Sequence, residues 1–419
     1  MKKFAIFIAA VFMSLSLTSC FESHQLNETA IVQAIAVDLA ENGQYEVTMQ
    51  IYAPKGGGST TAIDTSNNNA NIVSAKGKTI SEAMIHATAL QGEYIFAGHN
   101  RLLILGEEFA KQGVENVFSY FDRNHLTRQN IDVLVSKGKA KDIVALNIDQ
   151  GILAAETLEK TVENCETNGY ITRAPYYQFS RDMFLYYGCA AVPVIEKIEK
   201  PEQSQPEQKG GEQSQGKDGE ESGRQEDAAT DTPIDSVDVV KVEKTAVFKD
   251  YKLIDTLDQE QSRGVTFLSD SIKNTTLVAQ DSEGHYASVH IYECDSKLSP
   301  KFDGDQITFV LKVRAKASID EVLLPRGETT GAEDLEEFAD SAEQSIAADC
   351  TGAFNRAVKT DGSHLFSLGD MIHKKNPELW KQISEDFSDH LSELSFKTDV
   401  EIEITRLSIE ANQSVTKLK

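Results

Sequence analysis

The first half of the chain places its hydrophobic residues in two different periods, which predict strands and helices in alternation. Residues 30–38 (AIVQAIAVD) and 45–52 (YEVTMQIY) are rich in strand-forming residues and flank a turn that contains Asn42 and Gly43. Because Asn and Gly tolerate the positive φ of a tight turn, this stretch predicts a β-hairpin. The polar residues 54–71, which include three consecutive glycines, predict a loop after it.

A helix is predicted to begin at Thr79. The Thr79 side chain can cap free backbone N–H groups of the first turn, and Glu82, three positions on, completes a capping box. The apolar residues that follow recur at helical spacing and predict one buried face, made of Ile80, Ala83, Met84 and Ala87.

Two more strands and three more helices are predicted before residue 165. Residues 102–105 and 130–136 have the apolar composition of strands. Helices are predicted at residues 139–147, at residues 152–164, and around the apolar positions Val117, Phe118 and Phe121. This order of elements is typical of an α/β layer domain with a partly antiparallel sheet.

The second half of the chain has longer apolar patterns. Residues 238–248, 285–293 and 306–318 predict strands, and residues 249–252 (KDYK) predict a hairpin turn after the first of them. The strongest helical pattern of the chain covers residues 333–360. Its apolar face holds Leu335, Phe338, Ala342, Ile346, Cys350, Ala353 and Ala357, which predicts that Cys350 is a buried thiol.

A helix and a strand are predicted at the C-terminal end. Pro377 has a favoured first-turn position, and the helix it opens has an apolar face made of Trp380, Ile383, Phe387 and Leu391. The final strand alternates, with Phe396, Val400, Ile402 and Ile404 on its buried side and Lys397, Asp399, Glu401 and Glu403 on its solvent side. The long helix is therefore expected to pack on a largely antiparallel sheet.

Composition changes abruptly at Glu196. Residues 196–231 contain eleven acidic and five basic residues and almost nothing apolar, so their formal charge is −6. Such a segment cannot bury enough surface to offset its chain entropy, which predicts a disordered insertion. An acidic arm that binds a partner is the alternative interpretation.

The predicted fold is multi-domain, of α/β and α+β class, with mixed or antiparallel sheets and packed helices. A length of 419 residues is too great for one ordinary core and predicts two or three domains, of which we expect three. The expected divisions are a signal peptide (1–19), an N-terminal α/β domain (20–150), a middle domain (151–280) interrupted by the acidic insertion (196–235), and a C-terminal α+β domain (281–419) with its long helix at 333–360.

The start of the chain predicts a lipoprotein signal peptide. Lys2 and Lys3 precede an uncharged run at residues 4–17, and residues 17–20 read LTSC. The run is short for a bilayer span, which needs about 20 residues. We expect Cys20 to be acylated, by palmitate or similar chains, and to anchor the protein on the extracytoplasmic face of a membrane. An uncleaved helix with an incidental cysteine is the alternative.

The net charge narrows the range of partners. It is −25 for the whole chain and becomes −27 once Lys2 and Lys3 are removed. A surface with this much negative charge repels nucleic acid and anionic lipid head groups. Nucleic acid is therefore excluded as a partner. No later segment has enough consecutive apolar residues to span a membrane, and the lipid is therefore expected to supply the attachment.

Four cysteines remain beyond Cys20, and they are far apart with no CxxC motif. They indicate neither a zinc site nor a redox motif. Buried free thiols are the prediction, and a disulfide between the pair closest in sequence, Cys165 and Cys189, is the alternative. The four are Cys165, Cys189, Cys294 and Cys350.

Several stretches imitate sites of chemistry. Gly77, Lys78 and Thr79 resemble the end of a phosphate-binding loop, but the glycine required five residues earlier is Ile72, and Thr79 is better used as a helix cap. His99, in the GHNR stretch before a predicted strand, has no nucleophile at recognisable spacing, so we expect it to fix the loop.

The other histidines do not form a predicted metal site. His285 and His290 lie five positions apart on one predicted strand and so point to opposite faces. His373 and Asp370 form a single pair, which is too few ligands. We therefore predict no catalytic residue, no cofactor and no metal ligand, with a glycosidase-like carboxylate pair left open.

Taken in order, several stretches resemble the Ger(x)C family, the C-subunit lipoproteins of spore nutrient germinant receptors. The most recognisable is FAGHNRLLILGEEFAKQG at residues 96–113. Phe21 and Glu22 depart from the family pattern, where Trp and Asp are usual, and the acidic insertion is unusually long. The other matching stretches are residues 26–28, 30–38, 76–83, 133–143, 246–253 and 369–383.

The resemblance implies a three-domain lipoprotein on the outer leaflet of the inner spore membrane. It also implies that the protein acts together with two integral membrane subunits, one of them transporter-like, to sense nutrients and trigger germination. The resemblance implies no catalytic residues. A substrate-binding lipoprotein of an ABC transporter is the alternative function, although the long alternating strands at the C-terminus argue against its two parallel-stranded lobes. An envelope hydrolase is a third.

Overall fold

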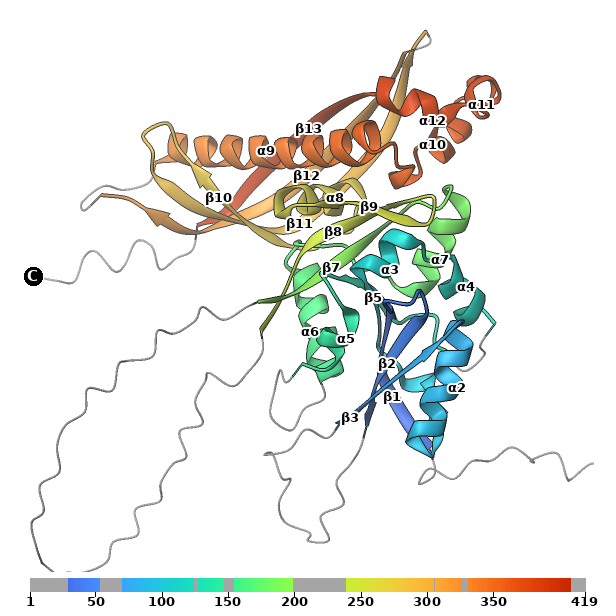
Figure 1. The fold of residues 1–419 in the computed structure, drawn as a ribbon. Helices are drawn as coiled ribbons and strands as arrows, with labels where there is room; N and C mark the ends of the chain where they lie inside the picture. Colours follow the sequence, from blue (N-terminus) through green and yellow to red (C-terminus); the bar gives the residue numbers. More distant parts are fainter. Residues whose placement is uncertain are drawn as a thin grey trace, which may run out of the picture.

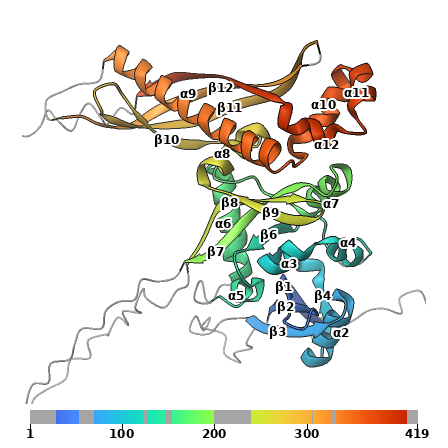
Figure 2. The same cartoon turned by 45° about the horizontal axis from the view of Figure 1, so that its top comes forward.

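The structure is a computed structural model that describes residues 29–52, 70–123, 127–146, 154–198, 239–304, 306–325 and 331–407. Within these residues the strands form two sheets, and helices pack on both (Figures 1 and 2). The mixed α/β and α+β class predicted from the sequence is confirmed. The predicted signal peptide and most of the acidic insertion lie outside the described residues.

The larger sheet is mixed. Its strand order is β3-β2-β1-β5-β6-β7-β8-β9, with β4 paired to β1 beside this path. The pairs among β1, β5, β6 and β7 are parallel, and the pairs at both ends are antiparallel. The strands are β1 (Thr29–Leu39), β2 (Tyr45–Tyr52), β3 (Ala70–Gly77), β4 (Tyr94–Phe96), β5 (Leu102–Gly106), β6 (Asp132–Ser136), β7 (Ala190–Ile198), β8 (Val239–Lys249) and β9 (Lys252–Leu257).

Local signals placed the first elements correctly. Gly43 has a φ of +75° in the turn between β1 and β2, which pair antiparallel as predicted. Thr79 caps helix α2 (Ile80–Gln91) by accepting from the backbone N–H of Glu82 at 3.0 Å. The capping box predicted a hydrogen bond from the Glu82 side chain to the N–H of Thr79. The Glu82 carboxylate instead accepts from the N–H of Lys78, one residue earlier, at 2.6 Å.

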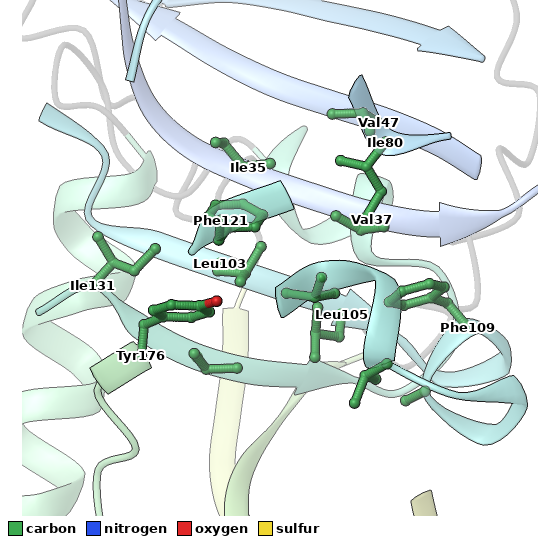
Figure 3. Close-up of a cluster of buried hydrophobic side chains, with 14 of the residues drawn as sticks. Ile35, Val37, Val47, Ile80, Leu103, Leu105, Phe109, Phe121, Ile131 and Tyr176 are labelled. Atoms are coloured by element: carbon green, nitrogen blue, oxygen red, sulfur yellow. The ribbon is translucent and has the colours of Figure 1, made fainter. Parts of the chain in front are cut away.

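Side chains of the parallel strands alternate between two cores, one on each face of the sheet. Ile35 and Leu103 enter the first core, whereas their neighbours Ala34 and Leu102 enter the second. Figure 3 shows the first core, where Ile35, Leu103 and Phe121 lie close together. Strands buried on both faces read as continuous apolar runs, which is why β5 and β6 were visible in the sequence.

Short helices cover the two faces of the larger sheet. Helices α2, α3, α4 and α7 contribute to the first core, and α5 and α6 contribute to the second. Phe118 and Phe121 of α4 and the four predicted apolar positions of α2 are all buried, as expected. The helices not yet given bounds are α3 (Glu107–Gln112), α4 (Glu115–Phe121), α5 (Ala140–Val144), α6 (Ala154–Thr167) and α7 (Tyr176–Leu185).

The smaller sheet has the order β10-β11-β12-β13, and the long helix α9 (Ala332–Phe354) lies along one face of it (Figure 1). Of the predicted stripe on α9, Phe338, Ala342, Ile346 and Cys350 are fully buried. The sheet is antiparallel except where β13 pairs parallel with β12. The strands are β10 (Thr275–Gln280), β11 (Tyr286–Asp303), β12 (Gln306–Leu323) and β13 (Ser395–Leu407).

Smaller helices complete this half of the molecule. Helix α8 (Gln259–Leu268) packs so closely on α9 that a Cβ on Gly264 would meet the carbonyl oxygen of Asp349 at 2.3 Å. After α9 come a π-helical turn (η5, Asn355–Thr360), a 3-10 turn (η6, Leu365–Ser367), α10 (Leu368–Lys375), α11 (Pro377–Ile383) and α12 (Phe387–His390).

Two sequence predictions were wrong at their edges. The loop predicted at residues 54–71 ends in β3, an edge strand in which only Ala75 and Gly77 are buried, so its apolar pattern is weak. The disordered insertion was predicted to begin at Glu196, but residues 196–198 belong to β7. Most of both segments lies outside the described residues.

The helix predicted from Pro377 through Leu391 is interrupted. Helix α11 ends at Ile383 and α12 begins at Phe387. Trp380 and Ile383 are partly buried, whereas Phe387 and Leu391 are buried in the core below α9. The helical pattern therefore predicted which side chains face this core, but not the break at residues 384–386.

The middle segment of the chain joins the first sheet. Residues 190–257 supply β7, β8 and β9 to the sheet that β1 begins, so a sheet boundary does not occur at residue 150. The division into three domains stays a prediction. The last rungs of the β7–β8 ladder pair Lys197 with Val240 and Ile198 with Val239, so the chain leaves and re-enters the sheet at one point.

Strand β8 separates two hydrophobic cores. Ala246 and Phe248 belong to the core of the larger sheet, while Val247 between them belongs to the core below α9. All three are fully buried. The two halves of the molecule therefore meet along this strand.

Leu103→Ala should lower the free energy of unfolding by about 2–5 kcal/mol, because Leu103 is fully buried at the centre of the first core. Leu90→Ala is the matched control, since Leu90 is 70% exposed on α2, and its effect should stay within about 0.5 kcal/mol. Urea unfolding followed by circular dichroism measures both. Equal effects of the two substitutions would contradict the assignment of this core.

Candidate functional site

Cys20, the predicted lipidation site, lies outside the described residues, which begin at Thr29 in β1. Acylation at this cysteine therefore stays a prediction. Within the part of the chain that the structure describes, no helix has both the length and the apolarity to cross a membrane.

The four other cysteines are free thiols in the structure, as predicted. Cys189 and Cys350 are buried, whereas Cys165 and Cys294 are partly buried. Burial raises the pKa of the Cys165 thiol to about 11 and that of Cys294 to about 12. It also raises the pKa values of Cys189 and Cys350. A nucleophilic cysteine needs the opposite shift, so none of the four is activated.

The residues that imitated a phosphate-binding loop form a helix start. A Cβ on Gly77 would meet the backbone nitrogen of Ala83 at 2.4 Å, so the chain folds tightly onto the first turn of α2. With Thr79 used as the cap, its hydroxyl binds the N–H of Glu82 at this helix end. The expectation that Thr79 is a cap is confirmed.

Each of the other candidate histidines has its own partner in the fold. His285 lies against Asp281, with Nδ1 and Oδ2 2.9 Å apart, just before β11. His290, on β11, contacts Thr276 of the neighbouring strand at 3.1 Å. His373 on α10 stacks on Trp380. Among the described residues, no group of three His, Cys, Asp or Glu side chains is arranged to hold a metal ion.

The carboxyl ends of the parallel strands, where open α/β sheets usually bind ligands, are filled by protein. Asp38 at the end of β1 is 3% exposed, and its carboxylate accepts from the N–H groups of Ala140 and Lys141 at 2.8 and 2.9 Å. It thereby caps α5 from a distant strand. A Cβ on Gly106 would meet an Asp38 oxygen at 2.1 Å, so no space remains there. Burial raises the pKa of Asp38 despite these bonds.

A cleft of about 400 Å³ lies at the junction of the two halves. Helix α7 and strand β7 line one side, and α8, β11 and the η6 turn line the other. Its volume falls in the range of small-molecule sites, which often occur between domains. Its charged and polar lining includes Arg173, Arg181, Asp182, Tyr186, Asp270 and Lys297.

Tyr186 connects the two sides of this junction. Its hydroxyl accepts from Ser367 at 2.7 Å and donates to Asp370 at 3.1 Å, and both partners lie more than 180 positions later in the chain. Burial raises the pKa of Tyr186 and also that of Asp182, which Arg181 binds at 2.7 Å. These groups suit fixed hydrogen bonding better than nucleophilic chemistry.

Backbone strain concentrates at the same junction. Phe366 and Ser367 have φ values of +63° and +53°, and Asp270 has +52°. A left-handed conformation at a residue other than glycine costs on the order of 1 kcal/mol and persists only where the surroundings enforce it. Asp270 is held by the N–H of Ser296 at 3.0 Å, and Ser367 by Tyr186. Sequence inspection missed these residues, because positive φ at Phe, Ser or Asp leaves no sequence signal.

His99 lies at the opposite end of the parallel strands from Asp38. Its ring packs edge-on against Phe96, and its Nδ1 is 3.4 Å from a guanidinium nitrogen of Arg128. The next residue, Asn100, is buried, and Arg101 binds Gln33 and Glu159. One contact within the loop and one to a distant segment fit the predicted role of His99 in fixing this loop.

Comparison with known proteins decides the family. The model of the spore germination protein N-terminal domain matches residues 22–197, and that of the spore germination B3/GerAC-like C-terminal domain matches residues 243–408. The chain belongs to the Ger(x)C family. The two matches stop on either side of the break between β7 and β8, and the junction cleft draws residues from both.

Family relatives resemble the chain along nearly its whole length. Spore germination protein KC of Bacillus subtilis (strain 168) is 23% identical and the match covers 97% of each chain. Spore germination protein B3 of the same organism is 20% identical, with 96% of this chain and 98% of the relative covered. The crystal structure of the GerBC protein superposes with a TM-score of 0.54 at 15% identity, over 91% of this chain and 99% of that one, which indicates a common fold.

The raised thiol pKa values predict slow alkylation in the native protein. At pH 8 about a quarter of an ordinary cysteine is thiolate, whereas a pKa of about 11 leaves a fraction on the order of a hundredfold smaller at Cys165. Iodoacetamide labelling read by peptide mass spectrometry should therefore be slow at Cys165 and Cys294 and rise about tenfold per pH unit. Labelling as fast as in denatured protein would contradict the described burial.

Tyr186→Phe should lower the free energy of unfolding by about 1–2 kcal/mol, since two hydrogen bonds across the junction are lost. Tyr177→Phe on the same helix is the matched control, because Tyr177 is 52% exposed, and it should change stability by less than about 0.5 kcal/mol. Urea unfolding of both variants gives the comparison. A Tyr186 variant as stable as the control would show that these bonds do not hold the junction.

Proposed function

We propose that the chain is a lipid-anchored, non-catalytic subunit of a spore germinant receptor. The observation that carries the proposal is the family relationship across both halves, together with relatives named as spore germination proteins that match 96–97% of this chain's length. A full-length match of this kind favours a shared role over reuse of one domain.

The proposed anchor is acyl lipid on Cys20, on the extracytoplasmic face of the inner spore membrane. The apolar run that ends in LTSC supports it, because this pattern is typical of lipoprotein signal peptides. Two or three acyl chains are enough for stable attachment, whereas one chain alone gives only marginal binding.

The proposed partners are two integral membrane subunits, one of them transporter-like. In this arrangement the chain contributes binding surfaces beside the membrane and performs no bond chemistry. The raised pKa values of its described cysteines and of Tyr186 support a non-catalytic role, since activated nucleophiles have lowered pKa values.

The test is Cys20→Ala in spores that carry the variant as their only copy of the gene. We expect the protein to leave the membrane fraction and nutrient-triggered germination to fall at least tenfold, because the subunit is no longer held beside its partners. Affinity purification from spore membranes should recover two integral membrane proteins with the unaltered chain and lose them with the variant.

Cys165→Ser is the matched control, since it removes a thiol that is not acylated in this proposal. It should leave membrane attachment, partner recovery and germination unchanged. A Cys20→Ala protein that stays in the membrane fraction and supports normal germination would overturn the anchoring proposal. Recovery of an ABC permease in place of receptor subunits would overturn the receptor assignment.

A further inference from the structure

A second, smaller pocket lies at the amino ends of β5 and β6, at the opposite edge of the sheet from Asp38. Its volume is about 170 Å³. Four segments that are far apart in the sequence line it: β1, the turn before β5, the turn before β6, and α6. The residue from β1 is Gln33, which lies at an irregularity in the β1–β2 ladder.

Asn100 is the unusual residue of this pocket. It is 2% exposed, and neither its side-chain Nδ2 nor its Oδ1 has a hydrogen-bond partner within the described ranges. Leaving a buried polar atom unpaired costs about 1–3 kcal/mol, so buried amides are nearly always bonded. By contrast, the buried Gln50 in the same half bonds through both ends of its amide, to the carbonyl of Val144 and the N–H of Ala155.

The charges around Asn100 leave one cation available. Arg101 is occupied, because it donates to Gln33 at 3.2 Å and forms an ion pair with Glu159. Among the described residues Arg128 has no acidic partner, and the one hydrogen bond of its guanidinium is to the ring nitrogen of His99, at 3.4 Å. Arg128 is exposed to solvent and lines the pocket together with the buried, unbonded amide of Asn100.

We propose that this pocket binds a small carboxylate that also carries a hydrogen-bond donor, the chemistry shared by amino acids and hydroxy acids. Arg128 binds the carboxylate, for which a guanidinium is well suited. The Asn100 amide pairs with the ligand through both ends: Nδ2 donates to an oxygen, and Oδ1 accepts from an amino or hydroxyl group. The pocket has room for a few non-hydrogen atoms beyond the two carboxylate oxygens.

This inference goes beyond the proposed receptor function, since it assigns a ligand site to the subunit itself. It also departs from the usual position of ligands in open α/β sheets, at the carboxyl ends of the strands. Here Asp38 closes that edge, and the amino ends of β5 and β6 hold the unpaired polar atoms instead.

Titration calorimetry of the full-length chain in detergent tests the proposal with two matched pairs of probes. L-serine and L-serinamide differ in the carboxylate, and L-lactate and propionate differ in the hydrogen-bond donor. We expect L-serine or L-lactate to bind at least tenfold more tightly than its partner compound, because a lost charged or buried hydrogen bond is worth about 1.4 kcal/mol or more. Which of the two binds identifies the amino acid or the hydroxy acid class.

Two substitutions separate binding from folding. Asn100→Leu should weaken binding of the preferred probe at least tenfold while leaving the thermal midpoint of the free protein unchanged or higher, because it removes unpaired buried polar atoms. Arg128→Gln should weaken it by a similar factor, whereas Arg123→Gln, an exposed arginine that does not line the pocket, should have no effect.

Two results would overturn the proposal. The first is an absence of binding by all four probes at millimolar concentration, which would mean that ordered water alone satisfies Asn100. The second is equal binding by wild-type protein and both the Asn100→Leu and Arg128→Gln variants, which would place the ligand elsewhere on the molecule.

Discussion

The sharing of strand β8 between two hydrophobic cores is the constraint on which the rest of the structure depends. Period-two alternation sends Phe248 into the core of the larger sheet and Val247 into the core below α9. A one-residue slip of this strand would exchange the two sets of side chains. The register of β8 therefore determines how both halves pack. The relative position of the two sides of the junction cleft depends on this packing.

Close packing on the far side of this strand reinforces the constraint. Gly264 lets α8 approach α9 until only a glycine fits, and Arg263 next to it pairs with the buried Asp349 at 2.6 Å. Burial raises the pKa of Asp349, and the pairing with Arg263 opposes that effect. Apolar packing and one paired charge thus hold α8 between the two sheets, where it also lines the cleft.

Much of the fold was predictable wherever a segment carries its own signal. The stripe on α9, the alternation in β13 and the Thr79 cap depend on neighbours within a few residues, and each was read correctly. Strand β3 was missed because an edge strand takes its structure from hydrogen bonds to β2, not from an apolar pattern of its own. Strand order, which places β5 beside β1, depends on contacts between distant segments that one sequence does not display.

The candidate sites were less predictable for the same reason. The GHNR stretch drew attention to His99 because histidine carries chemistry, yet the unpaired polar atoms belong to Asn100 beside it. Whether the Asn100 amide has hydrogen-bond partners depends on residues from four separate segments. These segments come together only in the folded molecule. The strained Phe366 and Ser367 are a similar case, since their φ values arise from packing across the junction.

The pairing of β7 with β8 creates a point in the fold where the length of the connecting segment can vary. Ile198 and Val239 are direct partners, so the forty positions between them depart from and return to neighbouring points. Closing a loop twice as long costs only about 0.6 kcal/mol more, a small amount beside the stability of two packed sheets. The length and composition of this segment can therefore change with little effect on how the two sheets fold and pack.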